Sequence, residues 1–243
     1  MKWKTPYTQQ FFRSETDTSL KAALKVVPEL LSVIWPSSVI DVGCGTGTWL
    51  SVFQHNGVSD VVGLDGEYVD STMLRVDRTL FVSCDLSRPL LLSRSFDLAI
   101  SLEVAEHLPA RRSGGFVADL CALAPIVLFS AAIPGQGGTN HINEQWQSYW
   151  SRLFRQNRFA ALECFGQRFW SDTDVSPEYA QNMVLYAAEG RIPSTTLHRF
   201  HNVAQNCRVV DVVHPHYWSN IGLRRIVNQL PSAVATAIRR RVK

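Results

Sequence analysis

The sequence has no continuous apolar segment long enough to cross a membrane. Its longest apolar run, residues 120–134, is interrupted by Pro125 and Ser130 and is shorter than the ~20 residues that a spanning helix needs. The N-terminus also lacks the continuous apolar stretch of a secretory signal. We therefore expect no transmembrane helix and a cytoplasmic protein.

A paired-cysteine motif is also missing. The 243 residues include five cysteines but no Cys-x-x-Cys pair. An odd number of widely spaced cysteines among apolar neighbours is typical of reduced thiols, so neither a disulfide framework nor a cysteine zinc site is expected. The cysteines are Cys44, Cys84, Cys121, Cys164 and Cys207.

No strong charge of one sign is present, because 24 basic and 21 acidic residues give a net charge of only +3. This balance excludes polyanion binding by bulk charge, and nucleic acid is not an expected partner. Six of the basic residues lie in residues 219–243, which hold no acid. That basic tail is interpreted either as a solvated helix or as a peripheral contact with the inner membrane face, where each basic residue contributes ~1 kcal/mol.

Short apolar runs that alternate with helical patterns dominate the sequence from residue 38 onward. Strands that are buried on both faces and joined by crossovers of this length predict an α/β fold with a doubly wound, mostly parallel, seven-stranded sheet. The predicted strands are residues 38–42, 61–64, 80–83, 96–101, 126–133, 159–165 and 183–188. The predicted helices are residues 19–35, 48–55, 69–76, 104–123 and 143–156.

Two regions are expected along the chain. Residues 1–190 form the main domain together with its N-terminal helix, and residues 191–243 form a C-terminal helical extension that carries the basic tail. Helices are expected from Ser219 and after Pro231. Asn143 is the expected N-cap of the helix over residues 143–156.

A glycine-rich turn follows the first predicted strand, in the string VIDVGCGTGTW over residues 39–49. Gly43, Gly45 and Gly47 permit positive backbone angles and let main-chain N–H groups come close to a ligand at the sheet edge. Thr48 stands where a dinucleotide fingerprint would place its third glycine. The string therefore predicts a nucleotide-type cofactor other than a diphosphate.

The string DVGCGTG over residues 41–47 resembles the first motif of class I S-adenosylmethionine-dependent methyltransferases. The resemblance implies this Rossmann-like fold, a methyltransferase activity and S-adenosyl-L-methionine as the cofactor. It also implies that Asp65 accepts hydrogen bonds from both ribose hydroxyls, that Asp85 meets the adenine amino group and that Leu86 offers a main-chain N–H. The whole implied cofactor-binding set is Asp41, Gly43, Cys44, Gly45, Gly47, Asp65, Asp85, Leu86 and Glu103.

Two histidines are candidate catalytic residues. His141 follows the fifth predicted strand, and an imidazole near its ordinary pKa can take a proton from a hydroxyl acceptor at neutral pH. The alternative is that His141 only caps the next helix or bonds the glycine loop. His107, in the string EVAEHLP over residues 103–109, is a candidate substrate-side or packing residue.

The same string raises the question of a metal ion. Glu103, Glu106 and His107, with His141, partly resemble the metal site of small-RNA 2′-O-methyltransferases. Glu103 and His107 would share one face of the predicted helix. Similar strings are also common in metal-free relatives, so no metal is expected.

Aromatic and histidine residues further along the chain have two interpretations. Trp146, Tyr149 and Trp150 recur at helical spacing, which favours packing, although one of them could face an acceptor. His214 and His216 lie in a predicted structured loop that could edge the pocket.

The expected function is O-methylation of a sugar, a glycan or another polar small molecule. The preference for a sugar rests on the resemblance of the loop over residues 137–146 and the basic tail to bacterial methyltransferases of polysaccharide and natural-product pathways. The alternatives are an RNA 2′-O-methyltransferase and a non-catalytic, methyltransferase-like binding module.

Overall fold

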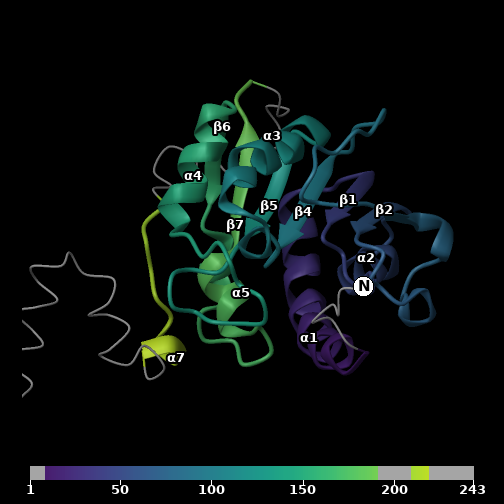
Figure 1. The fold of residues 1–243 in the computed structure, drawn as a ribbon, viewed down its shortest axis with the longest axis horizontal. Helices are drawn as coiled ribbons and strands as arrows, with labels where there is room; N and C mark the ends of the chain where they lie inside the picture. The colour runs from purple at the N-terminus through teal and green to yellow at the C-terminus, as the bar shows by residue number, and fades with distance from the viewer. Residues whose placement is uncertain (1–8, 191–208, 219–243) are drawn as a thin grey trace, which may run out of the picture.

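The computed structural model describes residues 9–190 and 209–218 (Figure 1). A seven-stranded sheet forms its centre, with the strand order β3-β2-β1-β4-β5-β7-β6. The strands are β1 (Ser38–Val42), β2 (Asp60–Asp65), β3 (Phe81–Ser83), β4 (Leu98–Leu102), β5 (Ile126–Ser130), β6 (Phe159–Glu163) and β7 (Val184–Ala188). β1 to β5 pair in parallel, and β7 runs antiparallel to β5 and β6. The predicted fold class and all seven predicted strands are confirmed.

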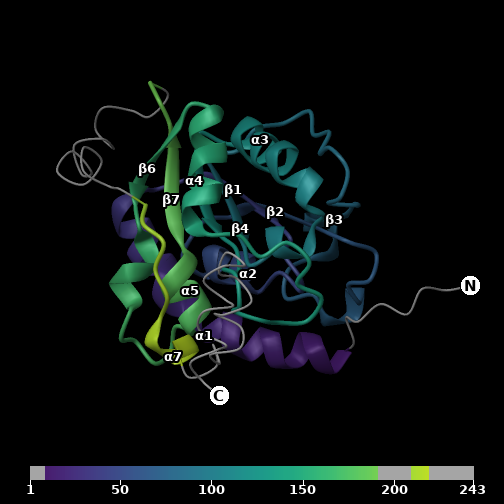
Figure 2. The same cartoon turned by 60° about the vertical axis from the view of Figure 1, so that its left-hand side comes forward.

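Helices cover both faces of the sheet (Figures 1 and 2). The α-helices are α1 (Gln9–Val33), α2 (Thr48–His55), α3 (Ser113–Leu123), α4 (Gln147–Gln156), α5 (Pro177–Asn182) and α7 (Pro215–Trp218). Single 3-10 turns are η1 (Ser71–Met73), η2 (Arg78–Leu80), η3 (Ala105–His107), η4 (Ala110–Arg112) and η5 (Phe165–Phe169).

Two hydrophobic cores follow from the alternation of side chains along the strands. Val39 packs on one face with residues of α1, α2 and α5, whereas Ile40 packs on the other with residues of α3 and α4. All five side chains of β1 are buried, as expected for a central strand with helices on both sides. This double burial explains why the strand residues form near-continuous apolar runs.

The chain order places a topological switch beside the glycine-rich turn. From β1 the sheet continues through β2 and β3 in one direction, while β4 pairs with the opposite edge of β1 and continues to β5. In open α/β sheets, ligands bind outside the carboxyl ends of the strands at such a switch. The loops after β1 and β4 therefore carry the residues of greatest interest.

The predicted helix over residues 69–76 is wrong, because this segment forms only the turn η1. Asp70 and Asp77 each accept a hydrogen bond from a backbone N–H two residues later, which favours tight turns. Arg75 N donates to Thr46 O at 2.8 Å and so joins the segment to the glycine-rich turn.

The predicted helix over residues 104–123 begins nine residues later than expected, at Ser113. Pro109 disfavours a helical conformation at the residue before it, and Leu108 is extended. Only the 3-10 turns η3 and η4 precede α3, so Glu103 and His107 do not share a face of one helix.

The helix predicted over residues 143–156 is also shorter, because α4 begins at Gln147 with Trp146 as its N-cap. Asn143 is not a cap. Its backbone N–H donates to Glu106 O at 3.0 Å, and its side chain donates to Ala105 O and Ser113 Oγ. These bonds hold the preceding loop against η3 instead of starting a helix.

Residues 209–218 pack against α4 and α5. Asp211 accepts hydrogen bonds from the backbone and side chain of Ser148, and His214 N donates to Gln181 Oε1 at 2.6 Å. The helices expected from Ser219 and after Pro231, and the basic tail, lie outside the described residues.

Cys44, Cys84, Cys121 and Cys164 are free thiols, whereas Cys207 lies outside the described residues. Within residues 9–190 and 209–218, no helix has the length and apolar character needed to cross a membrane.

Candidate active site

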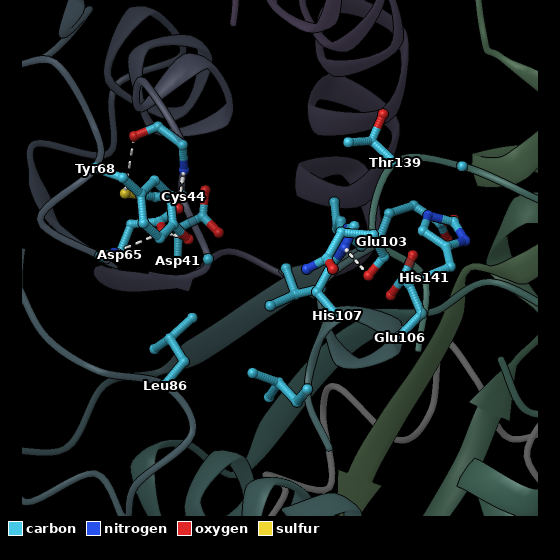
Figure 3. A pocket seen from close by; sticks show the side chains of 18 of the residues that line it. Asp41, Cys44, Asp65, Tyr68, Leu86, Glu103, Glu106, His107, Thr139 and His141 are labelled. Carbon is cyan, nitrogen blue, oxygen red and sulfur yellow. Dashed lines mark hydrogen bonds between the residues drawn. The ribbon is translucent and has the colours of Figure 1, made fainter. Parts of the chain in front are cut away.

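A cavity of about 790 Å³ opens at the carboxyl ends of β1, β2 and β4. Its walls are the glycine-rich turn, the loops after β2 and β3, the loop from β4 to η3 and the loop after β5 (Figure 3). Nearly all of the residues predicted for the site line this cavity. They are Asp41, Gly43, Cys44, Gly45, Asp65, Asp85, Leu86, Glu103, His107 and His141. Gly47 is instead the residue before α2.

Two glycines of the turn are required by its backbone. Gly43 has a φ of +89°, and a Cβ atom there would lie 2.3 Å from Val104 Cγ2. Gly45 has a φ of +53°, with open space where its Cβ atom would be. The turn therefore presents bare backbone to the cavity, as the sequence predicted.

Asp65, at the end of β2, is a buried carboxylate with three hydrogen-bond donors. Gly45 N donates to Oδ2 at 2.6 Å, and Gly66 N and the Tyr68 hydroxyl donate to Oδ1 at 2.7 and 2.5 Å. Burial raises the pKa of Asp65, and these three donors oppose the rise. Tyr68 was missed by the sequence analysis because no motif marks it.

Asp41 lies beneath the glycine-rich turn and is fully buried. Burial raises its pKa well above the ordinary range, and the nearby Asp65 raises it further. Its Oδ2 atom has no hydrogen-bond partner. A buried carboxylate oxygen in this state is suited to a donor or a cation supplied by a ligand.

Asp85 and Leu86 lie in the loop after β3. Asp85 Oδ1 accepts hydrogen bonds from the hydroxyl and backbone N–H of Ser87 at 2.6 and 3.0 Å. The Ser87 hydroxyl is the main cause of the lowered pKa of Asp85. The carboxylate therefore stays ionised at the cavity rim, while the Leu86 side chain is buried.

Glu103 follows β4 with a φ of +55°, in the left-handed region that few non-glycine residues adopt. Its carboxylate accepts hydrogen bonds from Gln136 Nε2 at 2.8 Å and Asn182 Nδ2 at 3.2 Å. Burial is the main cause of its raised pKa. Gln136 and Asn182 come from distant parts of the chain and were not predicted.

Glu106, His107 and His141 converge at the other end of the cavity. Glu106 is fully buried, and neither of its carboxylate oxygens has a hydrogen-bond partner. Burial, followed by the neighbouring Glu103, raises its pKa well above the ordinary range. Burial and the nearby His141 lower the pKa of His107 to about 4, so His107 is neutral at pH 7.

One potential ligand atom from each of these three residues lies within 4.8 Å of the other two. A carboxylate and two imidazoles are ligand types that divalent transition metals accept, so these residues could hold such an ion. Glu103 is not part of this cluster. The expectation of no metal stays a prediction.

The described residues that line the cavity include seven acids, and apart from the imidazoles of His107 and His141 they include no basic side chain. Among the described lining residues none is lysine or arginine. This composition favours a cationic or neutral ligand over a phosphorylated one. The acids are Asp41, Asp65, Glu67, Asp85, Glu103, Glu106 and Glu178.

The aromatic residues of α4 and the histidines near α7 are not among the described residues that line the cavity. Trp150 is buried, and its ring lies 5.2 Å from that of Phe129, so the packing interpretation is confirmed for this residue. His214 Nε2 bonds Trp170 O at 2.9 Å. The neighbouring Tyr217 hydroxyl donates to Glu178 Oε2, a lining residue, at 2.9 Å, and the interpretation that this loop could edge the pocket stays a prediction.

Comparison with known proteins agrees with this geometry. Residues 15–172, more than half of the chain, match the family described as "Methyltransferase domain". The chain belongs to this family, and its fold is that of the class I S-adenosylmethionine-dependent methyltransferases. No curated protein sequence matches the chain.

Solved structures with a similar fold include the methyltransferase domain of a bacterial Hen1, with 19% identity over 69% of this chain and 97% of that one and a TM-score of 0.50. DesVI of Streptomyces venezuelae has 22% identity over 53% of this chain, with a TM-score of 0.42. Magnesium protoporphyrin IX methyltransferase of Synechocystis PCC 6803, solved with bound SAH, has 14% identity over 78% of this chain and 90% of that one, with a TM-score of 0.49. In the comparison with DesVI, this chain spans only 58% of the length of the DesVI chain.

Proposed function

We propose that this methyltransferase transfers the methyl group of S-adenosylmethionine to an oxygen of a sugar or another polar small molecule. The observation that carries the proposal is the gathering of Asp41, Asp65 and Glu103 with the bare glycine backbone around one acidic cavity at the switch point of the sheet. When bound, S-adenosylmethionine supplies a methyl group on a cationic sulfonium.

The chain's own residues would bind and orient the donor. Asp65 would accept hydrogen bonds from ribose hydroxyls, and the Leu86 backbone, with the rim carboxylate of Asp85, would bind the adenine ring; all three residues line the cavity. The unpartnered Oδ2 atom of buried Asp41 is suited to a cationic part of the donor. The cavity walls hold the donor and acceptor together, which is the main catalytic contribution in a displacement of this kind.

His141 is the proposed general base. It lines the cavity, and its side chain is only 12% exposed. As the acceptor oxygen forms its bond to the methyl carbon and the carbon–sulfur bond breaks, the hydroxyl proton passes to the imidazole. His107 forms the neighbouring wall, with its ring centroid 4.9 Å from that of His141.

The acidic lining supports a neutral acceptor. A nucleotide chain would bring several phosphates to a cavity whose described lining has no lysine or arginine to neutralise them. A sugar hydroxyl brings no such charge. This difference favours a sugar over RNA as the acceptor.

Calorimetric titration with S-adenosylmethionine and S-adenosylhomocysteine tests the donor site. Asp65→Ala is expected to weaken binding of both compounds by about 1.5–3 kcal/mol, because hydrogen bonds to a charged group are lost. Asp174→Ala serves as the matched control, since this residue is exposed and pairs with Lys25 rather than lining the cavity. A well-folded wild-type chain that binds neither compound would refute the proposed function.

Incubation with labelled S-adenosylmethionine and a panel of sugars and glycan extracts, followed by mass analysis, tests the acceptor. A labelled O-methyl sugar supports the proposal, whereas labelled RNA with no labelled sugar would overturn it. Donor binding without transfer to any tested class would instead favour a non-catalytic binding module.

A further inference from the structure

We propose that Glu144 is a positioning residue that holds His141 in the tautomer with hydrogen on Nδ1, leaving Nε2 as the atom that takes the acceptor's proton. The inference rests on the proposed function, in which His141 is the base. Glu144 lies in the loop between β5 and α4, outside the set of residues predicted for the site.

The Glu144 carboxylate has a fixed place in this loop. Gly135 N donates to Oε2 at 2.7 Å, and Gly137 N donates to Oε1 at 2.8 Å. The side chain is only 21% exposed. Two backbone donors therefore hold both oxygens, and the carboxylate can orient a neighbour without being free to rotate.

The neighbour is His141. Its Nδ1 atom lies 3.3 Å from Glu144 Oε1. Since both Glu144 oxygens already accept hydrogen bonds from backbone amides, the carboxylate acts as an acceptor toward His141 too, and Nδ1 carries the hydrogen that points to it.

The Nε2 edge of the ring packs against residue 138, which must therefore be glycine. A Cβ atom on Gly138 would lie 2.2 Å from His141 Nε2. Gly138 itself lines the cavity. The glycine loop thus has two roles. Its amides hold Glu144, and the absence of a side chain at residue 138 lets the His141 ring occupy its present position.

The imidazole of His107, which lies next to His141, also carries its hydrogen on Nδ1. Its Nδ1 atom lies 3.3 Å from the backbone oxygen of Asn140, which can only accept a hydrogen bond. The His107 and His141 rings meet edge to face at 83°. Both rings therefore direct Nδ1–H groups toward acceptors in the loop over residues 140–144.

The tautomer can be measured directly on the full chain labelled with ¹⁵N-histidine. Long-range ¹H–¹⁵N spectra at pH 7.5, with a chelator present, distinguish Nδ1–H from Nε2–H rings, and His141→Gln identifies the signals of His141. We expect His141 to be Nδ1–H in the wild type and a mixture in Glu144→Gln, because an amide no longer demands a donor. Glu189→Gln, a surface change of the same kind, is expected to match the wild type.

The wild-type spectrum keeps the inference testable even if Glu144→Gln does not fold. A wild-type His141 with hydrogen on Nε2, or a folded Glu144→Gln with an unchanged tautomer, would overturn it. With an acceptor in hand, Glu144→Gln is expected to lower kcat by about tenfold or more, the range of general-base catalysis. Its affinity for S-adenosylhomocysteine is expected to stay unchanged.

Binding of S-adenosylhomocysteine, measured on the same samples, distinguishes failure of the proposed function from failure of the proposed role of Glu144. If the folded wild type binds none, the proposed function fails whatever the tautomer is. If the wild type binds it and the tautomer does not depend on Glu144, only the role of Glu144 fails.

Discussion

Removal of one hydroxyl group, in Tyr68→Phe, is expected to strengthen binding of S-adenosylhomocysteine. A carboxylate offers about four acceptor positions. Gly45 N, Gly66 N and the Tyr68 hydroxyl already occupy three of those on Asp65. A ribose diol donates two hydrogen bonds, so one of the present donors must leave for both ribose hydroxyls to bind.

The Tyr68 hydroxyl is the donor that can leave. The two amides belong to the turn after β1 and to the end of β2, whereas the tyrosine can rotate about its side-chain bonds. A hydrogen bond to a charged group contributes about 1.5–3 kcal/mol. Tyr68 is 42% exposed, so water partly replaces the bond when the hydroxyl moves. The net cost of releasing it is therefore about 1 kcal/mol, or roughly fivefold in affinity.

Calorimetric titration of wild type and Tyr68→Phe with S-adenosylhomocysteine measures this difference. Tyr149→Phe provides a control, because Tyr149 is not among the described residues that line the cavity. The 2′-deoxyribose analogue donates only one hydrogen bond, so Tyr68→Phe should affect its binding little. Equal or weaker binding of S-adenosylhomocysteine by Tyr68→Phe would refute the reasoning.

Three further results are expected. Gly43→Ala should abolish binding of S-adenosylhomocysteine or lower the melting temperature, since its Cβ atom would lie 2.3 Å from Val104; an unchanged titration and melting curve would contradict this contact. Burial raises the pKa of Cys121 to about 12, so the folded chain keeps this thiol proton where the unfolded chain loses it. The free energy of unfolding should therefore fall as pH rises from about 9 toward 12, less steeply in Cys121→Ala; equal slopes in chemical denaturation would exclude this cause. Chelator treatment should leave the affinity for S-adenosylhomocysteine unchanged in calorimetry, because Asp41 and Asp65 lie outside the cluster of Glu106, His107 and His141; a loss of affinity would place a metal at the donor site.

The parts of the site that follow the strands directly could be predicted from the sequence. The glycine-rich turn and Asp65 stand at the ends of apolar runs, and parallel strands bring such ends to one edge of a sheet. The position of these residues directly after predicted parallel strands was therefore enough to predict that they lie around one cavity.

The partners of these residues could not be predicted in the same way. Asn182 reaches Glu103 across 79 positions of the sequence, and Gln136 reaches it across 33. No periodicity or residue spacing in the sequence indicates either of these contacts. The antiparallel return of the chain through β7, which follows Asn182 and lies beside β5, brings Asn182 to Glu103, whereas Gln136 lies in the loop after β5, the neighbour of β4.

The predicted start of the helix over residues 104–123 was wrong for a different reason. Apolar periodicity continues through residues 104–112, but the proline at position 109 and the backbone bonds of Ile142 and Asn143 to Glu106 O impose turns there. Those turns place Glu106 and His107 against the loop of His141. A continuous helix over residues 104–123 would have separated them from it.

The acidic character of the cavity has a consequence for turnover. Methyl transfer converts a positively charged sulfonium into a neutral thioether, while the surrounding carboxylates remain where they were. A wall of acids without lysine or arginine in its described part attracts the charged reactant more strongly than the uncharged product. Under the proposed function, each methyl transfer therefore weakens binding of the demethylated product and favours its replacement by a new molecule of S-adenosylmethionine.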